Sequence, residues 1–196
     1  MSCRTLLAPF NANPRLPFAL KHWHPMKITA LEEYGLRCMM QLASGASDSP
    51  MTGAQVAERE GLTADYAGKL LNLLSQEDLV QSVRGRNGGF VLGRPASEIT
   101  LADIVGALSN DIFDSEYCDR HVGAESVCVH ESSCALRPVW ATISEMITLT
   151  LQSITLLDLL RSEDELSQEL QPLSNLTANA VGLVRPLHQL ELRGQN

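Results

Sequence analysis

Three of the five cysteines in this 196-residue chain lie within one short stretch. The stretch YCDRHVGAESVCVHESSC, residues 117 to 134, also holds His121 and His130 and lies between two segments with helical patterning. Thiolates and imidazoles are the side chains that bind zinc and iron-sulfur clusters. The spacing differs from the two-residue pairs of zinc knuckles and from a ferredoxin run. Taken alone, it leaves a metal site, a disulfide and a chance grouping open.

Composition narrows the protein class. An odd number of cysteines without a secretory signal argues against a disulfide framework and favours a reduced, cytoplasmic protein. A net charge of -8 argues against unspecific coating of nucleic acid but leaves room for a local basic surface. Residues 1–25 are proline-rich and lack acidic residues, so we expect a disordered extension with Met26 as the start.

Three helical patterns follow one another between residues 26 and 76. The first has an apolar stripe made of Leu31, Tyr34, Cys38 and Leu42. Thr52 begins the second helix, Gly61 interrupts it, and Thr63 begins the third. Two short helices joined by a tight glycine turn predict a helix-turn-helix.

Two β-prone runs come next, and we expect them to pair as a hairpin. Residues 80–83 and 90–92 flank a Gly/Asn-rich connection, which predicts a wing appended to the helix-turn-helix. Arg84 and Arg86 lie in this connection, and we interpret them as DNA contacts rather than as a solvated turn. The third helix would place these residues at the major groove: Thr63, Asp65, Tyr66 and Lys69. Tyr66 suits a core or phosphate position equally well.

The second half of the chain contains a pattern typical of helix pairing. Residues 98–135 are expected to hold a linking helix, capped by Thr100 with Asp103, followed by the cysteine loop. Apolar residues then recur at spacings of four and three up to Leu157, which predicts a dimerisation helix over residues 136–162. This regular seam and its polar neighbours favour a protein partner over a membrane. Residues 163–196 lack a sustained period and predict a flexible tail.

The order of these elements resembles the Rrf-two family of winged-helix regulators, which includes the iron-sulfur sensors IscR, NsrR and RsrR. The resemblance rests on MKITALEEYGLRCMMQLA, VAEREGLTADYAGKLLNLL, LVQSVRGRNGGFVLGRP and ITLADIV, then the cysteine loop and a long helix with Trp140. It implies a mainly α fold with a small β-wing: a winged helix-turn-helix over residues 26–97 plus a long dimerisation helix. It also implies a homodimer on a palindromic operator in double-stranded DNA. The expected activity is transcriptional regulation, as a repressor, in response to redox state, nitric oxide or iron-sulfur status.

The same resemblance implies an iron-sulfur cluster of the 2Fe–2S or 4Fe–4S type. By position in the loop its ligands would be Cys118, Cys128 and Cys134, although the interval after Cys118 is longer than is usual in the family. IscR-like members supply a histidine where this chain has Arg137, which cannot bind metal. NsrR-like and RsrR-like members use a carboxylate of the other subunit, eighth from the start. Counting from Met26, that residue is Glu33.

Other interpretations of the loop stay open. His121 or His130 would complete a tetrahedral zinc site with the three cysteines. Alternatively, Cys128 and Cys134 would oxidise to a disulfide in a thiol sensor that binds no cluster. Glu33 would then be an ordinary exposed glutamate. Catalysis is not expected, because no orienting group or oxyanion turn accompanies Cys134 and His130.

Overall fold

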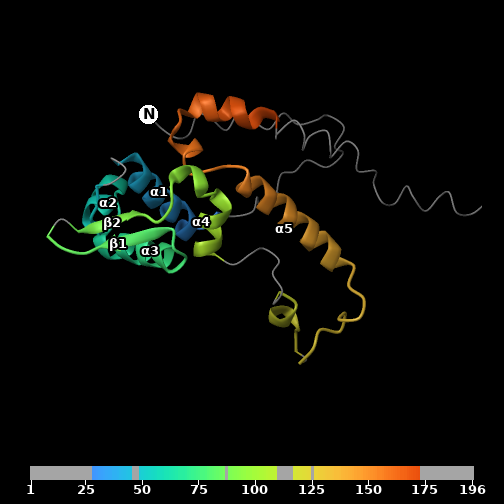
Figure 1. Ribbon diagram of the computed structural model, residues 1–196. Coiled ribbons are helices and arrows are strands. Elements are labelled where there is room, and N and C mark those ends of the chain that lie inside the picture. Colours follow the sequence, from blue (N-terminus) through green and yellow to red (C-terminus); the bar gives the residue numbers. More distant parts are fainter. Residues whose placement is uncertain (1–27, 46–48, 87, 110–116, 125, 173–196) are drawn as a thin grey trace, which may run out of the picture.

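The computed structural model describes residues 28–45, 49–86, 88–109, 117–124 and 126–172 (Figure 1). The extension expected over residues 1–25 and the last part of the expected tail, residues 173–196, lie outside this description. The α-helices and strands are α1 (Ala30–Ser44), α2 (Gly53–Glu60), α3 (Ala64–Gln76), β1 (Val80–Val83), β2 (Gly89–Leu92), α4 (Leu101–Leu108) and α5 (Leu136–Gln152). Short 3-10 helices are η1 (Ala96–Glu98), η2 (Asp119–His121) and η3 (Asp158–Leu160). The predicted mainly α fold with a small β-wing is confirmed.

Local side-chain caps explain where the helices of the helix-turn-helix begin and end. The Thr52 hydroxyl accepts from the backbone N–H of Gln55, whose side chain accepts from the N–H of Thr52 in return. Gly61 ends α2 with φ of 67°, a left-handed conformation that glycine adopts without a Cβ penalty. Thr63 then caps α3 by accepting from the N–H of Tyr66. These interactions produce the turn between α2 and α3.

The core of the winged helix lies between α1, α2, α3 and α4. Its fully buried side chains include Met39 of α1, Val56 of α2, Leu70, Leu71 and Leu74 of α3, and Ile104 of α4. Cys38 is also fully buried, and this burial raises the pKa of its thiol to about 11. Cys38 therefore belongs to the core, as the apolar stripe of the first helix predicts.

The wing is a two-stranded antiparallel hairpin. Val80 pairs with Leu92 and Val83 pairs with Gly89. A second pairing joins the loop-proximal half of β2 to the start of the helix-turn-helix: the N–H of Phe90 donates to the carbonyl of Met51 at 2.8 Å. A Cβ added to Gly89 would lie 2.6 Å from that Met51 oxygen, so glycine is needed for this close approach. The wing is thus anchored to the residues before α2 close to where its connecting loop begins.

Helix α5 ends ten residues earlier than the sequence predicts. It stops at Gln152, and residues 154–157 instead run beside the segment that leads into α4. The N–H of Leu101 donates to the carbonyl of Ile154 at 2.9 Å, and the N–H of Leu156 donates to the carbonyl of Ile99 at 2.8 Å. The Leu156 side chain is fully buried in the winged-helix core. The expectation of one helix through residue 162 is wrong because the chain's own core covers this apolar segment.

A short helix over residues 163–172 corrects the expectation of a flexible tail beginning at residue 163. Ser162 starts it: its backbone N–H and hydroxyl donate to the Glu165 carboxylate, and the N–H of Glu165 donates back to the Ser162 hydroxyl. This is a capping box, and the Ser-x-x-Glu pattern at these positions is the signal that the sequence reasoning missed.

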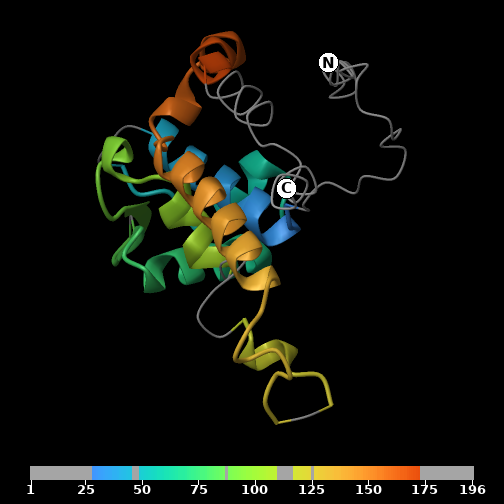
Figure 2. The same ribbon diagram turned by 90° about the vertical axis from the view of Figure 1, so that its right-hand side faces the viewer.

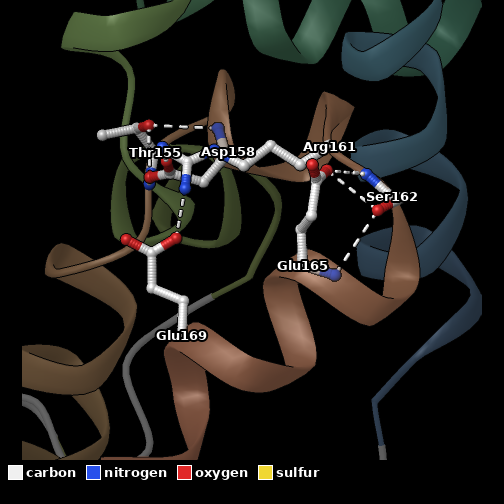
Figure 3. Close-up of polar contacts among 6 residues, drawn as sticks. All are labelled: Thr155, Asp158, Arg161, Ser162, Glu165 and Glu169. Carbon is white, nitrogen blue, oxygen red and sulfur yellow. Dashed lines mark hydrogen bonds and ion pairs between the residues drawn. The ribbon is translucent and has the colours of Figure 1, made fainter.

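Ion pairs hold this helix to the segment that follows α5 (Figure 3). Arg161 forms ion pairs with Asp158, at 3.0 Å, and with Glu169. Asp158 in turn accepts from the hydroxyl of Thr155 at 2.6 Å and from its backbone N–H at 2.9 Å. The backbone of Thr155 lies opposite Thr100, the cap of α4. Residues 154–160 therefore lie against the winged helix, and Arg161 ties the helix that follows to this segment.

Candidate functional site

Helix α3 carries the side chains expected at the major groove. Thr63, Asp65 and Lys69 are exposed, as that role requires. Tyr66 is half-buried, and its ring meets the Tyr34 ring of α1 edge-on, with centroids 6.1 Å apart and planes at 82°. Of the two roles that the sequence allows for Tyr66, the core position is therefore the one seen in the structure. The contact between the two rings joins the start of α3 to α1.

A shallow hollow runs along the exposed side of α3. Its lining consists of Ala64, Asp65, Gly68, Lys69, Asn72, Leu73 and Gln76. Asp65 and Lys69 were expected at the DNA surface, whereas Asn72 and Gln76 were not considered. Their spacing of seven residues from those two positions, which places them on the same side of the helix, was the available signal. The polar face is thus longer than the sequence reasoning proposed.

The wing tip carries the two exposed arginines. Arg84 and Arg86 follow β1, and both side chains face solvent. Arg94 lies at the base of the wing instead, 3.4 Å from the Asp103 carboxylate and donating to the carbonyl of Glu98. Within the described residues, Arg84 and Arg86 have no comparable acidic partner. Their charge is therefore available to a negatively charged ligand.

A salt bridge that the sequence did not indicate joins α1 to the last residue of α2. The Glu60 carboxylate, whose side chain is only 8% exposed, accepts from Arg37 Nε at 2.5 Å and from the Gln41 amide. The hydrogen bond to Glu60 raises the pKa of Arg37, so its guanidinium stays charged. Arg37 also lies over the Tyr34 ring, 5.4 Å from its centroid. These contacts fix the direction in which α3 leaves the turn.

The three loop cysteines are free thiols of intermediate exposure. Figures 1 and 2 show their loop projecting from the winged-helix body beyond the first turn of α5. Among the described residues, no three His, Cys, Asp or Glu side chains lie close enough together to hold a metal ion. The single chain therefore does not bring Cys118, Cys128, Cys134 and Glu33 together.

The loop histidines differ in their surroundings. The His121 ring stacks on Tyr117, with centroids 4.2 Å apart, and its Nδ1 lies 2.7 Å from the Tyr117 carbonyl oxygen. His130 is exposed, and its carbonyl accepts from the N–H of Ser133. Arg137 donates to the carbonyl of Glu131 at 3.0 Å, which ties the first turn of α5 back to the loop.

Glu33 and its neighbour Glu32 have separate roles at the start of α1. Glu32 completes a capping box, since its carboxylate accepts from the N–H of Thr29 at 2.6 Å. Burial works to raise the pKa of Glu32, but the hydrogen bonds from Thr29 outweigh it and the pKa lies below its ordinary value. Glu33 is exposed on the helix surface. Of the two acids, Glu33 is therefore the one whose carboxylate faces outward.

Helix α5 has no buried residue in the single chain. Its large apolar side chains that are 36 to 61% exposed are Leu136, Val139, Trp140, Ile143, Met146 and Leu149. Apart from the adjacent Val139 and Trp140 they follow one another at intervals of three residues, and together they form one broad apolar side of the helix, here called the α5 stripe. No helix among the described residues has both the length and the apolar character needed to cross a bilayer.

Comparison with known proteins gives this arrangement its context. Residues 28–162 match the Rrf2 family, described as iron-dependent transcriptional regulator. An HTH-type transcriptional regulator IscR from Photorhabdus laumondii is 31% identical over 141 residues, covering 72% of this chain and 83% of the relative. One from Yersinia pseudotuberculosis is 31% identical over 139 residues, covering 71% and 82%.

Solved structures agree with this result. CymR, the global cysteine regulator of B. subtilis, superposes with a TM-score of 0.55 at 30% identity, covering 69% of this chain and 96% of CymR. T. potens IscR superposes with a TM-score of 0.54 at 30% identity, covering 69% and 87%. The matched region includes the helix-turn-helix, the wing, the cysteine loop and α5. The chain belongs to the Rrf2 family of winged-helix transcriptional regulators.

Proposed function

We propose that this regulator acts as a homodimer that binds a palindromic operator and senses redox or iron-sulfur status through its cysteine loop. In this proposal Cys118, Cys128 and Cys134 hold an iron-sulfur cluster together with Glu33 of a second copy. The α5 stripe is the observation that carries the proposal. Six large apolar side chains exposed on one side of a helix indicate a surface that packs against another protein chain. A second α5 provides a matching stripe, and pairing would place two α3 helices on one duplex.

The side chains proposed as ligands are of the right type and number for an iron-sulfur cluster. Three free thiols of intermediate exposure lie on one loop, and none is committed to a disulfide. Three thiolates leave one coordination position, which an exposed carboxylate such as Glu33 can fill. Because the described residues of one chain do not gather these groups, binding requires a second chain and a closer packing of the loop. The site would thus form only in the dimer.

A bound cluster would supply a redox-reactive and oxidant-sensitive centre. The roles of the chain's own residues follow from where they lie. Cys134 directly precedes α5, so a fixed Cys134 restrains the first turn of the dimer helix. Glu33 is one helical turn from Arg37, which holds the helix-turn-helix through Glu60. Ligation would therefore tie the dimer helix of one copy to the DNA-binding unit of the other.

The test is to purify the full chain anaerobically, count iron and acid-labile sulfide, and record absorption spectra under argon and in air. Wild type should contain both elements and show a coloured cluster. Glu33→Ala should alter the spectrum and hasten iron loss in air, because an oxygen ligand is missing. Glu58→Ala removes an exposed glutamate of α2 and serves as the matched control. An unchanged spectrum and unchanged air sensitivity in Glu33→Ala would refute the carboxylate ligand.

A thiol sensor without a cluster is the second candidate. It is favoured by the structural likeness to CymR, including S. aureus CymR described in an oxidized form, with a TM-score of 0.51 at 28% identity. Cys128 and Cys134 lie on one loop and are both free. Absence of iron and sulfide, with a mass loss of two hydrogens after mild oxidation, would support it. Stoichiometric zinc would instead support a site completed by His121 or His130.

A further inference from the structure

Gly68 stands in the interior of α3, where glycine weakens a helix relative to alanine. Packing within the chain does not explain it, because a Cβ added at Gly68 would meet no atom within 4 Å. Gly35 of α1 differs, since a Cβ there would lie 2.3 Å from Leu108 Cδ1. A Cβ at Gly35 would displace the buried Leu108 side chain, whereas a Cβ at Gly68 would displace nothing among the described residues. Packing therefore gives no reason for glycine at position 68, and its place beside the hollow of α3 suggests one.

The surroundings of Gly68 indicate what approaches it. The residue lines the α3 hollow between Asp65 and Asn72, on the polar side of the recognition helix. Without a side chain at this point, the helix backbone is open to a close neighbour. The wing, with its two exposed arginines, follows α3 directly along the chain. In a family of DNA-binding regulators, the neighbour that fits a polar hollow on α3 is the floor of the major groove.

Asn72 lies one helical turn after Gly68, is exposed, and lines the same hollow. Its short amide reaches a base edge only if the groove floor comes close to the helix, which a side chain at residue 68 would prevent. A carboxamide both donates and accepts, so it pairs bidentately with the N6 and N7 atoms of adenine. Lys69 beside it donates to guanine or to a phosphate.

We propose that Gly68 is the point of closest approach between α3 and the major groove, and that Asn72 reads an adenine there. This inference rests on the DNA-binding role of the protein. It adds a contact further along α3 than Asp65 and Lys69. It also requires that Gly68 reduces the stability of the protein while increasing its affinity for DNA.

The test begins with a pool of random-sequence duplexes from which the full-length, anaerobically purified protein selects its binding sites. Wild type, Gly68→Ala, Asn72→Ala and the control Gly106→Ala are then titrated with the selected duplex and melted without DNA. Gly106 is a glycine inside α4 at which an added Cβ also meets no atom within 4 Å. It is more exposed than Gly68 and lies outside the α3 hollow, so it controls for the effect of replacing a helical glycine by alanine.

Gly68→Ala should raise the melting midpoint by about 2 to 4 °C and weaken binding to the selected duplex by about tenfold or more. Gly106→Ala should give a similar rise without loss of binding. Asn72→Ala should lose the preference for adenine at one position of each half-site while keeping the other preferences.

Wild-type affinity in Gly68→Ala, or a lowered melting midpoint in this variant, would overturn the role of Gly68. An unchanged adenine preference in Asn72→Ala would overturn the contact. Failure of the wild-type protein to select any sequence would count against sequence-specific DNA binding itself, together with this inference.

Discussion

Leu156 offers a direct test of how α5 is joined to the DNA-binding unit. Its side chain is fully buried, although it follows the end of α5 by only four residues. The N–H of Leu156 donates to the carbonyl of Ile99 at 2.8 Å, and the N–H of Leu101 donates to the carbonyl of Ile154 at 2.9 Å. The N–H of the next residue, Leu157, donates to the carbonyl of Ala96 at 3.1 Å. Because these bonds keep the backbone in place, a cavity left by Leu156→Ala cannot close easily.

The expected loss follows from this burial. A fully buried leucine replaced by alanine loses its whole transfer free energy and leaves a cavity, which together cost about 3 to 4 kcal/mol of the free energy of unfolding. For a chain of this size, that corresponds to a fall in melting midpoint of roughly 6 to 15 °C. Leu157→Ala is the matched control, since that neighbouring side chain is 47% exposed. Its free energy of unfolding should change by no more than about 0.5 kcal/mol.

Thermal and urea unfolding of the full chain, followed by circular dichroism, measure both variants. The protein concentration must be equal throughout, because the midpoint of a dimer depends on it. A large loss in Leu156→Ala alone is the expected result. Equal losses in the two variants would refute the reasoning and favour a single helix through residue 162, in which neither leucine enters the winged-helix core.

Two further predictions use groups that titrate in unusual surroundings. Burial raises the pKa of the Cys38 thiol to about 11. Iodoacetamide at about pH 8 should therefore label the three loop cysteines of metal-free protein well before Cys38. Equal labelling rates in peptide mass spectra would contradict this. The Thr155 hydroxyl and backbone N–H lower the pKa of Asp158, so its contribution to stability is present above its unfolded pKa and disappears as the pH falls through its lower folded value. Asp158→Asn should therefore lower the urea midpoint at neutral pH more than at about pH 3, and an equal decrease at both would count against the charged hydrogen bond.

Local signals in the sequence were sufficient for most of the DNA-binding unit. The Thr52–Gln55 and Thr100–Asp103 capping boxes, the glycine turn at Gly61 and the hairpin all appear where they were predicted. Each depends on residues no more than a dozen positions apart, so the interactions that form them can be recognised from spacing alone. The exposed positions of Asp65 and Lys69 follow from the same helical period.

The features that the sequence did not predict depend on contacts between residues far apart in the chain. The alternating apolar spacing continues past residue 152, but spacing does not reveal which surface covers an apolar side chain, and Leu156 enters its own chain's core. The Arg37–Glu60 pair joins residues 23 positions apart, which no local pattern predicts. Sequence therefore determined the helices of the DNA-binding unit, the wing and the presence of three cysteines on one loop. Tertiary structure alone decided where α5 stops and how α1 holds the recognition helix, because burial and ion pairing depend on what the folded chain brings together.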